Sequence, residues 1–432
     1  MRTLIISENR CRSNLVPFPL GPACVAAAAR AAGHEVRGLD LMFSDDPVRE
    51  VREAVEDFRP DCVGMAVRNI DDQDMGIREF FPEQARPVVE AVRSATRAPL
   101  VLGGAGFSIF PLECLDYFDL ELGLVGEGEA AFPRLLEALE TGEDPAGLPG
   151  VAVRRGGLRR VNPPGPPPDL FRLPLPDHAG FGVGNYDWVP GKTPPFVANL
   201  QGRRGCHMRC IYCPNPVIEG RVVRLRDPRS VADELELLEK EHGIATAFFT
   251  DALFTYPPGY TGELLQAIAS RRLALRWGCS VNPAHHAPGV FGRMGEAGCF
   301  HVSLGNESGS EQMLRLLRKD FGREQAARCV REAKAAGMKV QCFLLLGGPG
   351  ETRATVEESV DFLDGLEPDA VGVTVGIRIY PGCELHRIAL REGVVKPGQN
   401  LLRPAFYLSP AVAPWLHDRM REVCDARPGW ML

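Results

Sequence analysis

A chain of 432 residues is too long for one ordinary hydrophobic core and predicts two or three domains. Hydrophobic residues make up 45% and charged residues 24%, as is usual for globular proteins. The net charge of −7 argues against nucleic-acid binding, and no apolar run reaches the ~18 residues of a membrane span. The 13 cysteines, an odd number, lie mostly in apolar segments and favour a reducing compartment such as the cytoplasm.

The first 145 residues alternate between short apolar runs and helical patterns. Strands are expected at 3–6, 35–40, 62–67, 99–102 and 120–125, and helices at 22–32, 48–58 and 83–96. Strands that alternate with helices predict an α/β domain with a parallel, doubly wound, Rossmann-like sheet over residues 1–145.

Such a sheet binds ligands at the carboxyl ends of its strands, and the least ordinary sequence lies there. A charged segment follows the third strand, and two glycine clusters follow the fourth and fifth. The candidate binding residues are Arg68, Asn69, Gly103, Gly104, Gly106, Ser108, Gly126 and Glu127. Two plainer interpretations stay open: the glycines form tight turns, and residues 68–74 form a solvated loop.

Residues 146–195 predict a linker. Residues 150–161 read as a small hairpin with a Gly-Gly turn, and the proline-rich run 162–169 reads as a stiff, extended spacer.

Residues 196–385 repeat the strand-and-helix pattern. Strands are expected at 196–199, 246–250, 275–281, 301–304, 339–346 and 371–379, and helices at 230–242, 261–271, 289–298, 324–337 and 354–366. Six such units predict a partial TIM-type (β/α)6 barrel, whose site lies at the carboxyl ends of its strands. Residues 386–432 are expected to cap this domain or to shape its substrate pocket.

Three cysteines lie within eight residues, in the pattern CxxxCxxC formed by Cys206, Cys210 and Cys213. A cubane iron–sulfur cluster ordinarily takes four cysteine ligands, so a three-cysteine loop leaves one iron open to a small molecule. Zinc is the alternative, with His207 as a strained fourth ligand, and so is a set of plain thiols.

Further motifs follow the predicted strands of this second domain. Asp251 follows the second strand, and Glu307 and Ser308 follow the fourth within Gly-Asn-Glu-Ser-Gly-Ser. The fifth runs into a glycine–proline turn that begins at Leu346, Gly347 and Gly348. Each motif alone is weak, whereas their order after successive strands is specific.

The cysteine spacing, with Tyr212 as the aromatic residue before the third cysteine, resembles that of the radical S-adenosylmethionine (SAM) superfamily. The resemblance covers about residues 190–385 and implies a 4Fe–4S cluster held by Cys206, Cys210 and Cys213. It also implies a SAM site at Tyr212, Asp251, Glu307, Ser308, Leu346, Gly347 and Gly348. Asp251 replaces the Gly-Gly-Glu run that commonly binds the SAM amino group, and a purely structural role for this carboxylate stays open.

The first 145 residues resemble the cobalamin-binding domain that precedes many radical SAM domains. The resemblance rests on the strand order, on Gly103 to Pro111, and on Gly126 to Glu129. It implies that the candidate residues of this sheet edge bind cobalamin. The Asp-x-His-x-x-Gly motif is missing after the first strand, so no histidine is expected to ligate cobalt. A Rossmann-like cap without cobalamin is the alternative.

Together the two resemblances place the chain with class B radical SAM methyltransferases. They imply a 5′-deoxyadenosyl radical made from SAM, and cobalamin-dependent methylation of an unactivated carbon in a small-molecule or lipid intermediate. The alternatives are a cyclase, ring-contraction or mutase enzyme that does not methylate, and a corrinoid or electron carrier. An external electron donor such as flavodoxin or ferredoxin is expected. Candidate substrate contacts are Tyr380, Arg403 and Tyr407, with aromatic packing as their equal alternative.

Overall fold

The computed structural model describes residues 1–12, 16–186 and 197–432 and divides them into two compact units. The first unit contains residues 1–72, 79–192 and 217–219, and the second contains 73–78, 193–216 and 220–432. The expected strand at 196–199 begins at Phe196, which lies outside the described residues, as do linker residues 187–195.

The first unit is built on a seven-stranded sheet in the order β2-β1-β3-β4-β5-β6-β7. Strands β1 to β5 are parallel and β6 and β7 are antiparallel. Their bounds are β1 Arg2–Ser7, β2 Glu35–Asp40, β3 Cys62–Ala66, β4 Leu100–Gly103, β5 Leu122–Leu124, β6 Val151–Arg155 and β7 Leu158–Val161. The predicted hairpin is therefore present, and its two strands extend this sheet.

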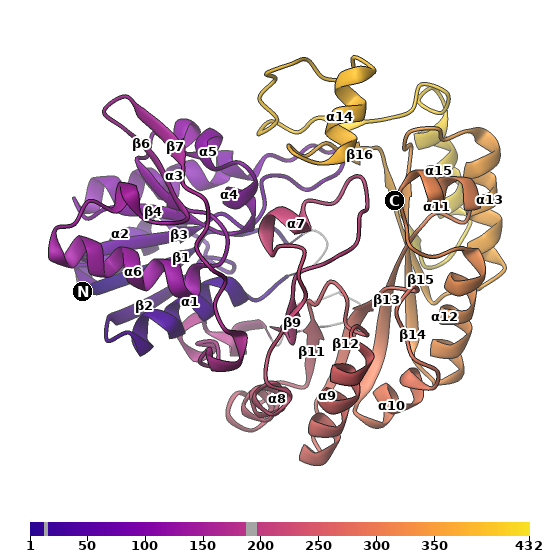
Figure 1. The fold of residues 1–432 in the computed structure, drawn as a ribbon, viewed down its shortest axis with the longest axis horizontal. Helices are drawn as coiled ribbons and strands as arrows, with labels where there is room; N and C mark the ends of the chain where they lie inside the picture. The colour runs from indigo at the N-terminus through magenta and orange to yellow at the C-terminus, as the bar shows by residue number, and fades with distance from the viewer. Residues whose placement is uncertain (13–15, 187–196) are drawn as a thin grey trace. The chain divides into compact units, whose positions relative to one another are not determined.

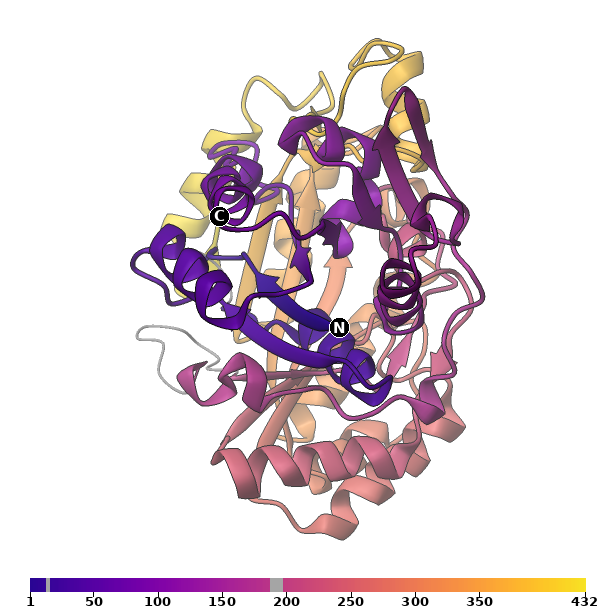
Figure 2. The same ribbon diagram turned by 90° about the vertical axis from the view of Figure 1, so that its left-hand side faces the viewer.

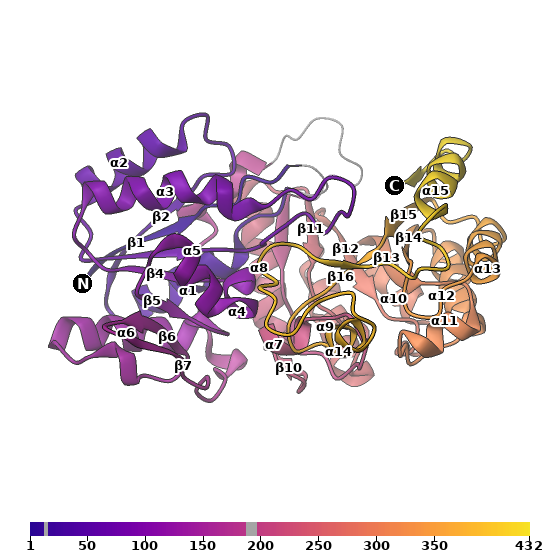
Figure 3. The same ribbon diagram turned by 90° about the horizontal axis from the view of Figure 1, so that it is seen from above.

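Helices cover both faces of this sheet (Figure 2). Helices α2 and α3 lie on one face, and α1 and α6 lie on the other (Figure 3). The helices are α1 Leu20–Ala31, α2 Pro47–Phe58, α3 Phe81–Ala95, α4 Ala105–Ile109, α5 Pro111–Phe118 and α6 Gly128–Thr141. The arrangement is the doubly wound sheet that the alternating sequence pattern predicted.

The second unit contains six parallel strands in chain order, with β18 added beside the last of them. They are β8 Ala198–Leu200, β11 Thr246–Phe249, β12 Arg276–Val281, β13 Cys299–Glu307, β14 Lys339–Leu346, β15 Ala370–Val375 and β18 Trp430–Met431. Short antiparallel pairs are β9 Arg203–Arg204 with β10 Arg224–Leu225, and β16 Ile377–Arg378 with β17 Phe406–Tyr407.

Helices lie along the outer side of these strands (Figure 1). They are α8 Pro228–His242, α9 Pro258–Arg271, α10 Val290–Glu296, α11 Glu311–Leu316, α12 Arg323–Ala335 and α13 Arg353–Asp364. Three further helices are α7 Asn215–Ile218, α14 Glu384–Arg391 and α15 Leu416–Asp425. The result is the predicted partial TIM-type barrel. Among the helices that the structure describes, none has the length and apolar character needed to cross a bilayer.

Local sequence explains where these helices begin and end. Helix α8 begins after Asp227, whose side chain accepts a hydrogen bond from the Arg229 amide, and Pro228 occupies its first turn. It ends at Gly243, which adopts the left-handed conformation at φ 68°. The strands behind it bury Trp277 completely, and the Trp277 indole donates to the Ala297 carbonyl at 2.7 Å.

One short segment leaves the first unit and belongs to the second. Residues 73–78 follow the third strand of the first sheet, yet they cluster with the barrel. The Met75 side chain lies against Gly376, where an added Cβ would stand 2.7 Å from the Met75 sulfur. The Arg78 guanidinium lies over the Phe406 ring, 5.9 Å from its centroid.

Candidate functional site

The glycine loop after β4 packs tightly on the end of β3. Gly104 has φ +97°, and a Cβ there would lie 2.6 Å from the Val67 carbonyl oxygen. The Gly106 amide donates to the carbonyls of Val67 and Arg68 at 3.0 and 2.9 Å. Gly104 is therefore required by the contact between these two loops, independently of any ligand, and Gly106 leaves little space, since a Cβ there would lie 3.1 Å from the Val67 carbonyl oxygen.

Ser108 joins the loops after β4 and β5. Its hydroxyl donates to the Gly104 carbonyl at 2.9 Å and accepts from the Gly126 amide at 2.9 Å. Because the Ser108 hydroxyl is buried and bonded on both sides, its evident role is to fix the edge of the sheet. Its contact with cobalamin stays a prediction, as does that of Glu127.

Arg68 and Asn69 form a pair at the carboxyl end of β3. With its amide oriented to satisfy both groups, Asn69 donates to the Arg68 carbonyl at 3.1 Å and accepts from Arg68 Nη1 at 3.0 Å. The Arg68 side chain stays accessible, while desolvation by neighbouring protein atoms lowers its pKa. An accessible guanidinium held by its neighbour suits ligand contact at this edge.

The first strand ends in two buried polar residues that the sequence analysis did not select. Glu8 is 4% exposed, and burial raises the pKa of its carboxyl to about 8. The Asn9 amide nitrogen is buried without a hydrogen-bond partner in the part of the chain that is described. The corrin ring carries neutral amide side chains, so an uncharged acid and an unpaired amide fit cobalamin. The polar run Ser7-Glu8-Asn9 after an apolar strand was the available signal.

A cavity of about 990 Å³ in this unit lies elsewhere. It borders Pro99, Leu100 and Leu122, which begin β4 and β5, and is lined partly by Arg93 and Arg154. It is therefore at the amino edge of the sheet, opposite the predicted cobalamin contacts.

Replacing Gly103 with alanine is expected to lower cobalamin retention at least tenfold, a change of about 1.4 kcal/mol, and to leave folding intact. An added Cβ at Gly103 would meet only the Leu124 carbonyl oxygen, at 3.9 Å, and would otherwise project into open space. Gly104→Ala is the contrasting variant, which should lose stability through its contact with Val67. Corrinoid absorbance after gel filtration and the unfolding midpoint separate the two effects. Unchanged retention in Gly103→Ala would place the closest cobalamin approach elsewhere.

Backbone hydrogen bonds fix the three-cysteine loop at its first cysteine and in its middle. The Cys206 amide donates to the Gly220 carbonyl at 3.1 Å. In the middle, the Ile211 amide donates to Leu317 at 3.2 Å and its carbonyl accepts from Leu385 at 2.9 Å. The loop is thus held by segments that precede α12 and begin α14.

The three thiols of this loop are close enough to influence one another. Cys206 is buried, and Cys210 and Cys213 are half-buried. Burial, with smaller contributions from Cys210 and Cys206, raises the pKa of Cys213 to about 12. A bound cation is needed to hold such thiols as thiolates, and iron supplies that charge.

No three His, Cys, Asp or Glu side chains converge on a single-ion site within the described ranges. A cubane presents a separate iron to each cysteine, so its ligands need not meet at one point. The donor set therefore fits the predicted cluster.

A buried lysine beside this loop was missed by the sequence analysis. Lys319 Nζ lies 3.4 Å from Glu307 Oε1 and donates to the Tyr212 hydroxyl at 3.2 Å. Desolvation lowers the Lys319 pKa, but Glu307 and Cys210 outweigh it, so the net pKa is raised and the lysine stays charged. Glu307 itself has φ 62°, a left-handed conformation that is strained for a non-glycine residue. Tyr212 and Glu307, both predicted SAM contacts, are thereby brought together around one cation.

Asp251 is completely buried and faces the protein interior. Its Oδ1 accepts from the Gly202 amide at 2.8 Å, and its Oδ2 lies 3.2 Å from Arg203 Nε. Arg203 is also buried and donates to the carbonyls of Leu253 and Tyr256. These contacts support the structural role that the sequence analysis left open, and SAM binding by Asp251 stays a prediction.

The remaining predicted SAM residues make structural contacts at the strand ends. The Ser308 hydroxyl lies 2.9 Å from that of Ser359. Leu346 is buried and its carbonyl accepts from the Gly376 amide at 2.8 Å. Gly347 has φ +95°, and both it and Gly348 are buried. Their positions at the carboxyl ends of β13 and β14 agree with the prediction, and their SAM contacts stay untested.

His207 pairs with a second histidine beside the cluster loop. The Nε2 atoms of His207 and His285 lie 3.1 Å apart, and both rings pack on Tyr256. The sequence analysis considered His207 only as a zinc ligand. His285 was missed because it is 78 positions away in the chain.

The three predicted substrate contacts have different surroundings. Tyr407 is buried and its hydroxyl donates to Glu392 at 2.5 Å. Tyr380 lies under the guanidinium of Arg378, 5.1 Å from ring centroid to Cζ. Arg403 is exposed. Substrate contact by these residues stays a prediction.

Comparison with known proteins identifies both units. The model of the radical SAM superfamily matches residues 202–363, and that of the B12 binding domain matches residues 12–136. The chain therefore contains both a radical SAM domain and a B12-binding domain, as the two resemblances implied. Its cofactors are accordingly a 4Fe–4S cluster, SAM and cobalamin.

Methyltransferases are prominent among its relatives. It is 28% identical to a tryptophan 2-C-methyltransferase of Streptomyces laurentii, over 87% of this chain and 72% of that protein. It is 25% identical to a cytidylyl-2-hydroxyethylphosphonate methyltransferase of Streptomyces wedmorensis, over 93% of this chain and 83% of that protein. Its fold matches the solved radical SAM methyltransferase TsrM of Kitasatospora setae with a TM-score of 0.83 and 25% identity, over 100% and 90% of the two chains.

Lys319→Met is expected to make the cluster potential more negative by at least about 60 mV, which for one electron corresponds to about 1.4 kcal/mol. The reason is that a buried cation stabilises an added electron nearby. Lys319→Arg, which retains the charge, should restore most of the potential. Redox titration followed by electron paramagnetic resonance measures the shift. An unchanged potential in Lys319→Met would show that this charge does not act on the cluster.

Proposed function

We propose that this protein is a cobalamin-dependent radical SAM methyltransferase that methylates an unactivated carbon of a small-molecule or lipid biosynthetic intermediate. The observation that carries the proposal is the presence, in one chain, of the three-cysteine loop at the barrel and the glycine-lined edge of the cobalamin-binding sheet. The likeness to methyltransferases over most of their length supports methylation as the outcome.

The residues have separate roles in this proposal. Cys206, Cys210 and Cys213 hold the cluster. Lys319, kept charged by Glu307, offsets negative charge beside these thiolates. When bound, the cluster and SAM supply a 5′-deoxyadenosyl radical, and cobalamin supplies the methyl group.

The strand-end residues lie beside the two cofactor sites in this proposal. Leu346 and Gly347 are buried at the carboxyl end of β14, where SAM is expected to bind. On the other sheet, Asn9 and Arg68 offer hydrogen-bond donors to the amide side chains of the corrin. A cytoplasmic location is part of the proposal, because the cluster and the many cysteine thiols suit reducing conditions.

Product analysis of the anaerobically reconstituted protein tests this function. Corrinoid bound to the protein, S-adenosylhomocysteine and 5′-deoxyadenosine are expected together when SAM, a reductant and substrate are supplied. 5′-Deoxyadenosine without S-adenosylhomocysteine would instead support a cyclase, ring-contraction or mutase reaction. Absence of both products would support a carrier.

A further inference from the structure

Exposed arginines surround the three-cysteine loop. Arg209 lies within the loop, between Met208 and Cys210, and is exposed. Arg221 is exposed and donates to the Met208 carbonyl at 3.3 Å. Neither arginine forms an ion pair with a residue in the described ranges, so their charges are available to a partner.

Two more arginines lie close in the chain to the residues that hydrogen-bond to the Ile211 backbone. Arg318 follows Leu317, whose carbonyl accepts from Ile211, and its side chain is 53% exposed. Arg387 lies on α14, two residues after the Leu385 that donates to Ile211, and is 69% exposed. Both arginines contact Glu384, at 3.9 and 2.5 Å, which places them beside each other.

These four residues, named here the arginine rim, carry a local excess of positive charge. The carboxylates beside them include Glu384, which two of them share, and the exposed Asp320 beside Lys319. The whole chain has a net charge of −7, so the rim is opposite in sign to the rest of the molecule. Val222, 72% exposed and adjacent to Arg221, adds an apolar contact of the kind found at the centre of interfaces.

The position of the rim suggests what binds there. Arg209 is exposed and directly precedes Cys210, so the cysteine loop reaches the surface on this side. Radical SAM enzymes need an external reductant. A positively charged rim around a near-surface redox centre attracts a partner with an acidic surface around its own redox centre.

We propose that the arginine rim docks a small acidic electron-carrier protein of the flavodoxin type. The proposal rests on the proposed function and gives the reductant its binding surface. In the complex, one electron passes from the flavin hydroquinone of the carrier to the oxidised cluster. The flavin becomes a semiquinone, and the cluster is reduced by one electron.

The test measures cluster reduction by photoreduced bacterial flavodoxin in stopped flow, with the protein holding its cluster. The variants are Arg209→Glu/Arg221→Glu and, outside the cysteine loop, Arg387→Glu. Reduction is expected to slow about tenfold or more at low ionic strength. The wild-type rate should fall as salt rises, because screening weakens charge attraction. The variants should lose most of this salt dependence.

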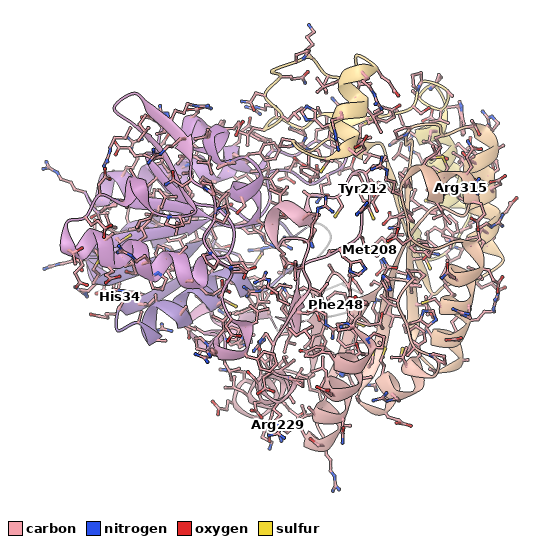
Figure 4. The ribbon with its side chains drawn as sticks, viewed as in Figure 1. His34, Met208, Tyr212, Arg229, Phe248 and Arg315 are labelled. Carbon is pink, nitrogen blue, oxygen red and sulfur yellow. The ribbon has the colours of Figure 1, made fainter. Side chains whose placement is uncertain are left out.

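Arg229→Glu is the matched control for Arg387→Glu, since it makes the same charge change on the same unit. Arg229 is exposed at the start of α8, well away from Tyr212 in the cluster loop (Figure 4). Its reduction rate should equal that of the wild type. Rim variants reduced by flavodoxin as fast as this control would overturn the proposal.

A second reductant separates this proposal from the proposed function. Dithionite is small and needs no docking surface, so dithionite-driven formation of products from SAM should be the same in rim variants and wild type. Loss of that activity in the rim variants would overturn the docking role, because it would show damage to the site itself. Wild-type protein that is reduced quickly by flavodoxin but forms no products would contradict the proposed function alone.

Discussion

Replacement of Cys206, Cys210 or Cys213 by serine is expected to remove the cluster and, with it, all formation of 5′-deoxyadenosine. Each cysteine supplies one of only three protein ligands, so no spare thiolate in the loop can take its place. Iron content and the charge-transfer absorbance near ~400 nm that is typical of cysteine-ligated clusters measure the loss. The expected residual activity is indistinguishable from that of protein without iron.

Cys424→Ser provides the control for this prediction. Cys424 is a half-buried thiol on α15 with no place in the cysteine loop, so its replacement should leave iron content unchanged. Full iron content in any of the three loop variants would contradict the assignment of that cysteine as a ligand.

Asp251→Ala is expected to destabilise the protein by about 3–5 kcal/mol, because it leaves the Arg203 guanidinium buried without its counter-charge. Arg203 is 1% exposed, and desolvation already lowers its pKa. The loss would appear as a lower denaturant midpoint of unfolding, measured without SAM. Asp233→Ala removes one of two partners of Arg271, the other being Glu236, at a half-exposed position and should change stability by less than about 1 kcal/mol.

Asp251→Asn separates the two interpretations of this residue. The amide retains an acceptor for the Gly202 amide but lacks the charge that Arg203 requires. A structural Asp251 predicts reduced stability in this variant. Normal stability combined with lost SAM binding would show instead that Asp251 binds the SAM amino group.

Local patterns predicted the strands and the loops that follow them. The bounds of β2 and β14 match the predicted ranges. For β14 the reason is its apolar run, since a run of that length has few other ways to bury itself. The cysteine loop was equally evident, since its ligands are close together in the chain.

Contacts between distant residues were beyond the reach of these patterns. Lys319 and Glu307 are separated by 12 positions and a helix, and nothing in the sequence marks that lysine as buried. Arg203 and Asp251 are 48 positions apart in the chain, so their pairing was not visible in the sequence. The motif-based interpretation therefore assigned the Asp251 carboxylate to SAM binding. Pairing of this kind depends on the packed fold, which brings opposite charges together where water is absent.

Residues 73–78 belong to the second unit although their neighbours in the chain belong to the first, and this limits how the protein can be cut into fragments. A barrel expressed from residue 197 onward would lack Met75 against Gly376 and Arg78 against Phe406, and would expose that apolar strip to solvent. A cobalamin-binding fragment would carry the same six residues with nothing to pack on. The two units are therefore not interchangeable modules: a chimaera that swaps one of them must carry a matching Met75–Arg78 strip with its barrel.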